Sequence, residues 1–315
     1  MSDLIRLPLG DIVEAFITWV IDVFGGFFDV ISTIFGGLYD GAEWLFTTPP
    51  FWVVIIVIAA IAWLARGWQL AVGTVIGLLV IVSVDQWENA MQTLALTIVA
   101  VLIAVVIAIP VGIWAARSQT VSKVVRPILD FLQTMPAFVY LIPAIFLFGI
   151  GVVPGMVATI LFAVAPGVRL TELGIRGVDK EVVEAGNAFG ATPGRILRQI
   201  QLPLAMPSIM AGVNQIIMLA LSMAVIASMV GAPGLGKDII QALSRTDISL
   251  GFEAGLAVVI IAMILDRVTS GFGAARGPRR RAASPTSSDE VGKADSTAHV
   301  DSTVDAAADQ RPVNA

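Results

Sequence analysis

The stretch Gly231–Asp238, GAPGLGKD, has the spacing of a loop that could hold the phosphates of ATP, because a glycine is followed by four residues and then Gly-Lys. Such a loop needs Ser or Thr after the lysine to bring a hydroxyl to Mg²⁺, and Asp238 stands there instead. It must also follow a buried strand and open a helix, whereas Met218–Val230 is a long apolar run. We therefore expect a tight turn at the end of a spanning helix, with Lys237 in water.

The composition predicts an all-α integral membrane protein. Of 315 residues, 57% are hydrophobic and 14% are charged, against roughly 25% charged in an ordinary soluble domain. There is no cysteine, and the single histidine, His299, lies in a polar tail, so disulfides, thiol catalysis and His/Cys metal sites are disfavoured. We expect no cofactor in this chain. The first ten residues, MSDLIRLPLG, lack the pattern of a removable signal peptide.

Seven apolar stretches predict about seven spanning helices. They lie at about 51–65, 68–84, 91–116, 128–149, 153–171, 204–230 and 251–270, each near the length that crosses a bilayer. The first two form a transmembrane hairpin, 51–84, and the others belong to a core at 85–275. Internal prolines at Pro110, Pro136, Pro143 and Pro166 predict kinked helices.

The N-terminal segment, residues 1–50, predicts an amphipathic helix rather than a span. Polar or small residues recur at steps of three and four from Asp11 to Glu43, and the other face is heavily apolar. Such a helix is expected to lie along the membrane surface or to pack on its neighbours, with its acidic stripe in water. The alternative is a broken, glycine-interrupted spanning hairpin.

Lysine and arginine predict the orientation. With seven spans, one side of the membrane collects nearly all the basic residues, including Arg117, Arg176 and Arg198, while the other holds only Arg6, Lys237 and Arg245. Because the basic side is cytoplasmic, the N-terminus is expected outside and the C-terminus inside. The tail, 276–315, has no apolar period and is expected to be disordered in the cytoplasm.

The loop at 172–203 is the only sizeable polar stretch within the membrane region. A helix is expected around Val182–Phe189, ended by Gly190, and a second short helix is expected to begin at Thr192-Pro193. Pro203 is expected to close the loop. Two short helices with an exposed apolar patch need a partner protein, although a loop packed on its own bundle would also account for the helices.

The loop also carries a recognisable signature. Glu184-Ala185-Gly186, followed by Gly190, Ile200 and Leu202-Pro203, resembles the EAA loop of permease subunits of bacterial ABC importers, with Gly186 where the family usually has alanine. The resemblance extends to Phe131–Gly151, Gln201–Gly236 and Ala262–Ser270, which are similar to the glycine betaine/proline permease family of the ProU type.

This resemblance implies the type I ABC importer permease fold and a transport function. The chain would be a pore subunit and not an enzyme, taking up a compatible solute such as glycine betaine, proline betaine or a related quaternary amine. Its partners would be cytoplasmic ATPase subunits, which carry ATP and Mg²⁺, an external solute-binding protein, and a second permease chain in a homodimer. Residues 184–186, 190, 200, 202 and 203 would couple to the ATPase. Nucleic acid is not an expected partner.

Few polar residues within the spans are available to meet a solute. Asn214, Gln215 and Ser222 are candidates for lining the pathway, because polar groups inside a membrane tend to face cavities. Met218 is a candidate because methionine offers an adaptable, polarizable surface. Hydrogen bonding between helices accounts for the polar residues equally well, and packing accounts for Met218. Phe131, Phe138 and Tyr140 are aromatic candidates for a quaternary ammonium site, or packing residues.

Two other classes of protein remain open at this point. An ion-driven secondary transporter would need acidic residues within the spans or broken half-helices in two related halves, and the chain shows neither convincingly. A membrane scaffold or channel would lack any ATPase partner.

Overall fold

The computed structural model describes residues 9–274, and the described part is helical with no strand. The predicted disorder of 276–315 lies outside the described residues. The elements, in chain order, are α1 (Leu9–Thr47), α2 (Phe51–Arg66), α3 (Trp68–Ser83), α4 (Trp87–Arg117), α5 (Gln119–Thr134), α6 (Ala137–Phe148), α7 (Val152–Arg176), α8 (Lys180–Ala188), α9 (Pro193–Ile196), the π-helix η1 (Leu197–Gln201), α10 (Leu202–Ala227), the 3₁₀ turn η2 (Ser228–Val230), α11 (Leu235–Arg245) and α12 (Ile248–Ala274).

Five of these helical stretches are long and apolar enough to cross a membrane, and the number rises to six if α5 and α6 together form one span. They are Glu14–Thr47, Trp87–Arg117, Val152–Arg176, Pro193–Val230 and Ile248–Gly271. The hairpin predicted at 51–84 is present, but α2 and α3 have only 16 residues each. At 1.5 Å per residue each is about 24 Å long, shorter than a hydrocarbon core of about 30 Å.

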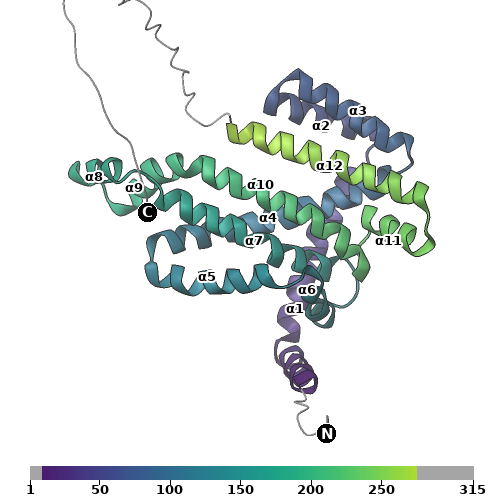
Figure 1. Ribbon diagram of the computed structural model, residues 1–315, viewed down its shortest axis with the longest axis horizontal. Coiled ribbons are helices and arrows are strands. Elements are labelled where there is room, and N and C mark those ends of the chain that lie inside the picture. Colours follow the sequence, from purple (N-terminus) through teal and green to yellow (C-terminus); the bar gives the residue numbers. More distant parts are fainter. Residues whose placement is uncertain (1–8, 275–315) are drawn as a thin grey trace, which may run out of the picture. The chain divides into compact units, whose positions relative to one another are not determined.

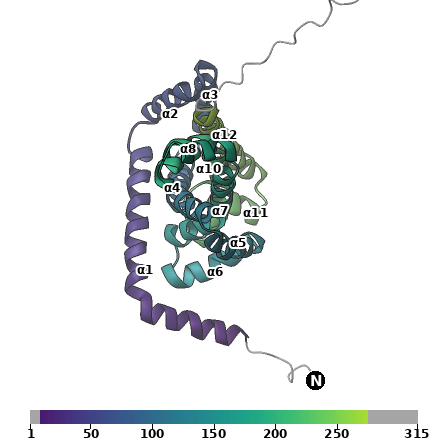
Figure 2. The same cartoon turned by 90° about the vertical axis from the view of Figure 1, so that its left-hand side faces the viewer.

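The N-terminal segment forms one continuous helix of 39 residues, α1, which bends along its length (Figure 2). Its later half packs on the bundle: Tyr39 is buried in a core shared with α4 and α7, and Gln92 donates a hydrogen bond to Glu43 at 2.9 Å. The apolar side of its earlier half, including Phe16, Trp19 and Phe27, is exposed. By length and composition, Glu14–Thr47 also qualifies as a span.

The span predicted at 128–149 is broken into two helices at Pro136, one of the prolines predicted to kink a helix. The chain bends by 100° between α5 and α6, at Met135 and Pro136. Proline disfavours the helical conformation of the residue before it, and Met135 is accordingly extended, with φ −73° and ψ 136°. By contrast, α4 and α7 continue through Pro110 and Pro166.

The centre of the bundle is formed by α4, α7 and α10, which lie side by side (Figure 1). Glycines allow their backbones to approach closely. A Cβ atom on Gly112 of α4 would lie 2.5 Å from the Cβ of Thr171, and one on Gly167 of α7 would lie 2.4 Å from Cδ1 of Ile216. Gly212 of α10 faces the backbone of Gly167 in the same way. Small residues of this kind are what hold helices together in a bilayer, where apolar surface alone gives no preference for protein over lipid.

The remaining helices pack around this centre. α12 contacts α10, and the α2–α3 hairpin lies against α12 (Figure 1). Their apolar core includes Val54 and Ile55 of α2, Leu78 of α3, and Ile260 and Ile261 of α12. α8 and α9 lie at the start of α10 and α11 lies beyond its end, so the loop with the EAA-like signature and the GAPGLGKD stretch are at opposite ends of one helix.

The glycine contact between α7 and α10 gives a direct test of this packing. We expect Gly167→Val to lower the free energy of unfolding by about 1–3 kcal/mol, the usual cost of overpacking, because its Cβ would lie 2.4 Å from Ile216. Gly255→Val in α12 is the matched control, since no atom lies within 4 Å of a Cβ at that position. Unfolding of the purified protein in a denaturing detergent series measures both. Equal stability of the two variants would contradict the packing described here.

Candidate functional site

The candidate site is built on α8, the helix that carries Glu184-Ala185-Gly186. Its start is fixed by Asp179, whose side chain accepts a hydrogen bond from the Glu181 N–H at 2.9 Å. Its end is followed by Gly190, which has a φ of +72°, in the left-handed region that favours glycine. The helix predicted around 182–189 and its termination at Gly190 are confirmed.

The second part of the loop differs from the expectation. α9 begins at Pro193 after Thr192, as predicted, but the helix then continues through η1 into α10, so Pro203 does not close the loop. The Leu202 N–H bonds to the Leu197 carbonyl, five residues back, as in a π turn. Pro203 has no N–H and needs no acceptor where the hydrogen-bond register changes. The non-helical connections are Gly177–Asp179 and Phe189–Thr192, so the polar loop is shorter than 172–203.

The signature residues bring the two parts of the loop together. A Cβ on Gly186 would lie 2.8 Å from Cδ1 of Ile200, so the two residues are in direct contact. An alanine at position 186, the usual residue of the family, would fit if the flexible end of the Ile200 side chain moved. Leu197 is buried in a small core with Ile175 and Ala205, which anchors the loop to the ends of α7 and α10. Glu184, Ala185, Gly190 and Pro203 are exposed, and Leu202 is half-buried.

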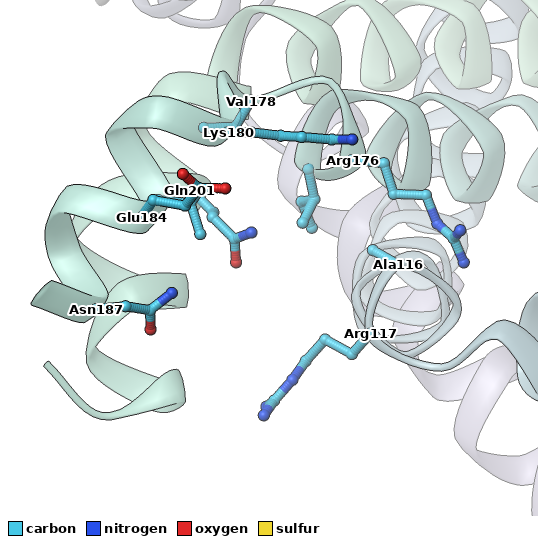
Figure 3. Close-up of a pocket in the computed structure, with 10 residues that line it drawn as sticks. Ala116, Arg117, Arg176, Val178, Lys180, Glu184, Asn187 and Gln201 are labelled. Atoms are coloured by element: carbon cyan, nitrogen blue, oxygen red, sulfur yellow. The ribbon is translucent and has the colours of Figure 1, made fainter.

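A cavity of about 420 Å³ lies between α8 and the ends of α4 and α7 (Figure 3). Figure 3 shows Glu184 and Asn187 of α8 facing it across from Arg117 of α4 and Arg176 of α7. Lys180 and Gln201 complete its polar lining. Three cationic side chains therefore surround one carboxylate, and the cavity as a whole favours an anionic group.

An exposed apolar patch accompanies this cavity. Phe189 is 90% exposed at the end of α8, and Val182 is 41% exposed. A second cavity, of about 450 Å³, is lined by Val182 together with Leu173 of α7 and Leu204 of α10, both of which are exposed. The patch expected from the sequence is present and is not covered by the described part of the chain.

The predicted pathway residues do not all lie on one face of α10. Gln215, Met218 and Ser222 are exposed along one face of α10, at the spacing of helical turns. Asn214 points elsewhere: its Nδ2 donates a hydrogen bond to Oδ1 of Asp266 on α12 at 3.0 Å. This is the interhelical bonding that the sequence left open as an alternative. Asp266 was not among the predicted site residues, although an acidic residue inside the predicted span 251–270 marks a candidate functional position.

The aromatic candidates also separate. Phe131, at the end of α5, and Phe138, at the start of α6, are exposed on either side of the 100° bend. Tyr140 is buried and packs edge-on against Phe162, with ring centroids 6.3 Å apart. Tyr140 is therefore a packing residue, and only the two phenylalanines present open faces.

The GAPGLGKD stretch is a packed turn that leads into α11, a helix that was not predicted. Gly231 and Gly234 have φ angles of +92° and +117°. The Leu235 N–H donates to Thr93 Oγ1 of α4 at 2.8 Å, and Asn89 Nδ2 donates to Asp238 Oδ2 at 2.7 Å. Lys237 is exposed, as expected. Because the first amide of α11 is bonded to Thr93 and a helix precedes the turn, the stretch lacks the architecture of a phosphate-binding loop.

Comparison with known proteins identifies the family of this fold and site. Residues 108–282 match the family described as "Binding-protein-dependent transport system inner membrane component". The chain is 47% identical over 269 residues to the glycine betaine transport system permease protein OpuAB of Bacillus subtilis (strain 168), covering 85% of this chain and 95% of OpuAB. It is 47% identical over 277 residues to the glycine betaine/proline betaine transport system permease protein ProW of Escherichia coli (strain K12), covering 87% of this chain and 78% of ProW.

A solved structure supports the fold independently. A chain of the MetNI methionine ABC transporter, in an inward-facing conformation, superimposes with a TM-score of 0.56 at 21% identity, covering 61% of this chain and 96% of that chain. At this identity the likeness concerns the fold, which is that of a type I ABC importer permease. The chain belongs to the family of inner membrane components of binding-protein-dependent transport systems.

Proposed function

We propose that this chain is the permease subunit of an ATP-driven importer for glycine betaine, proline betaine or a related quaternary amine. The observation that carries the proposal is the 47% identity to the glycine betaine permease OpuAB over 95% of that protein's length. Such relatives are named permease proteins, which are transport subunits rather than enzymes. They favour an ABC importer over the ion-driven alternative.

The loop around α8 is the proposed contact with the ATPase. Its features suit a docking element: a short helix with small residues at 185 and 186, an exposed carboxylate at Glu184, and the exposed ring of Phe189. Exposed apolar surface of this kind is typical of an interaction site. ATP and Mg²⁺ would be bound by that partner, and residues 184–186, 190, 200, 202 and 203 would transmit its movement to α7 and α10.

The proposed orientation follows from the same geometry. The end of the bundle with α8 also holds Arg117, Arg176 and Arg198, whereas Lys237 and Arg245 belong to α11, beyond the other end of α10. The excess of basic residues favours the cytoplasm for the α8 end, and the N-terminus outside. An external solute-binding protein would then deliver the solute near α11.

The proposed pathway runs along an exposed polar face that a lipid environment would not tolerate. Gln215 and Ser222 of α10 are exposed, and so are Asp130 and Gln133 of α5. Charged and amide groups within a bilayer face water or other protein, because exposure to hydrocarbon is costly. We infer that a second permease chain, in a homodimer, encloses this face and leaves a water-filled route between the two copies.

Charge reversal at Glu184 tests the coupling site. We expect Glu184→Lys to lower solute uptake and solute-stimulated ATP hydrolysis by about 5-fold to 150-fold, the range of typical coupling free energies. The change adds a fourth cation to the cavity that holds Arg117, Arg176 and Lys180. Labelled glycine betaine uptake into vesicles containing the assembled transporter measures the effect.

Glu181→Lys is the matched control, because Glu181 is exposed on the same helix but does not line the cavity. It is expected to keep most of the uptake. Normal uptake in an inserted Glu184→Lys variant would refute the assignment of the loop.

Thiol labelling tests the pathway, because the chain has no cysteine of its own. We expect Ser222→Cys to react with a water-soluble, membrane-impermeant thiol reagent, and the reaction to be slowed in the presence of binding protein and glycine betaine. Val106→Cys on α4 is the control: Val106 is 69% exposed but lies in an apolar stretch, where a thiol in lipid stays un-ionised and unreactive. Equally slow labelling of the two variants would exclude Ser222 from a water-filled route.

A further inference from the structure

A buried carboxylate lies close to the candidate coupling site. Glu172, in α7, is only 3% exposed. Its Oε1 accepts hydrogen bonds from Ser122 Oγ at 2.7 Å and from Arg126 at 2.9 Å, both on α5, and Arg176 Nε lies 3.1 Å away. A buried charge is tolerated only when partners of this kind compensate it. We call Glu172, Ser122, Arg126 and Arg176 the Glu172 cluster.

Arg176 connects the Glu172 cluster to the coupling loop. Besides its contact with Glu172, it donates a hydrogen bond to the Ala115 carbonyl of α4 at 2.7 Å. It is the last residue of α7, and only Gly177–Asp179 separate it from α8. It lines the same cavity as Glu184 (Figure 3). Arg176 is therefore the member of the Glu172 cluster that faces the cavity beneath α8.

A second ion pair extends the connection along α5. Asp130 accepts a hydrogen bond from Arg169 of α7. Arg126 pairs with Glu172 and Asp130 pairs with Arg169, so the residue numbers rise along α5 and fall along α7 and the two helices run antiparallel. α5 supplies the cation of the first ion pair and the carboxylate of the second. All three ion pairs within residues 9–274 belong to this α5–α7 contact or to Arg176.

Apolar packing of α5 on the bundle is limited to Leu129 and to the partly buried Val125 and Leu132. Leu129 is its one buried large apolar side chain, whereas Val124, Ile128 and Phe131 are each more than half exposed. The position of α5 therefore also depends on the directional polar contacts with α7. Removing one partner of a buried, hydrogen-bonded charge such as Glu172 is costly, so a movement of either helix that separates Glu172 from Ser122 and Arg126 is opposed.

We propose that Glu172 is a positioning residue for energy coupling. Movement of α8 reaches Arg176, and the Glu172 cluster carries it to Ser122 and Arg126 of α5, and so to the bent α5–α6 pair on the proposed pathway face. This inference rests on the proposed function. It adds a route through α5 to the direct route through α10, with Glu172 as the junction.

The test measures coupling rather than activity alone. The complete transporter, with its ATPase and solute-binding protein, is reconstituted in liposomes, and labelled glycine betaine uptake and ATP hydrolysis are followed in the same vesicles. We expect Glu172→Gln to reduce the solute moved per ATP by about 2-fold to 30-fold, with ATP hydrolysis by the assembled complex retained. Glu88→Gln, at an exposed position in the first turn of α4, is the matched control and should leave the ratio unchanged.

A charge swap at the exposed pair covers the case in which Glu172→Gln does not fold. We expect Asp130→Arg to reduce the same ratio, because it would set two cations against each other, and Asp130→Arg combined with Arg169→Asp to restore most of it. If these ion pairs only stabilised the fold, the substitutions would lower protein stability without changing the solute moved per ATP. An unchanged ratio in folded Glu172→Gln or Asp130→Arg, or no rescue by the double variant, would overturn the proposal. Failure of the unmodified transporter to take up glycine betaine would instead count against the proposed function.

Discussion

The close approach of the α4, α7 and α10 backbones is the constraint on which the other features depend. In a bilayer, apolar side chains gain little by leaving lipid for protein, so helices associate where small residues let their backbones touch. Gly112 meets Thr171, and Gly167 meets Gly212. Closer to the loop, a Cβ on Gly174 would lie 2.7 Å from Ser208. The end of α7 and the start of α10 are thereby held together, and α8, which connects them, has a defined place on the bundle.

Much of the architecture could be predicted from the sequence, because hydrophobicity and helix termination are local properties. Gly190 and Thr192-Pro193 marked the boundaries of the short helices for the same reason. Pro136 predicted a kink in the stretch 128–149, but the 100° size and the direction of the bend could not be predicted, because a proline marks where a helix bends and not which way the chain then runs. α11 was not predicted, because a short amphipathic helix that follows several glycines has the amino-acid composition of a turn.

The site was predicted less completely, for a geometric reason. Neighbouring residues on a helix point about 100° apart, so whether Asn214 or Gln215 faces the exposed side depends on how α10 is rotated. That rotation is fixed by contacts such as Gly212 against Gly167, which belong to the tertiary structure. The partners of Glu172 could not be predicted either, because they too are set by the tertiary structure: Ser122 and Arg126 lie 50 and 46 residues away in the chain.

One continuous helical stretch, Pro193–Val230, leads from the loop around α8 to the glycine turn before α11. Its 38 residues are about 57 Å long at 1.5 Å per residue. Gly212 touches Gly167 near the middle of this length. The stretch is packed against α7 along most of this length, from Gly174 against Ser208 near the loop to Gly155 against Ala227 near the other end. The two ends of the bundle are therefore joined by one unbroken run of helix, and the chain reverses only at the positive-φ glycines 231 and 234, beyond which α11 is bonded to Thr93.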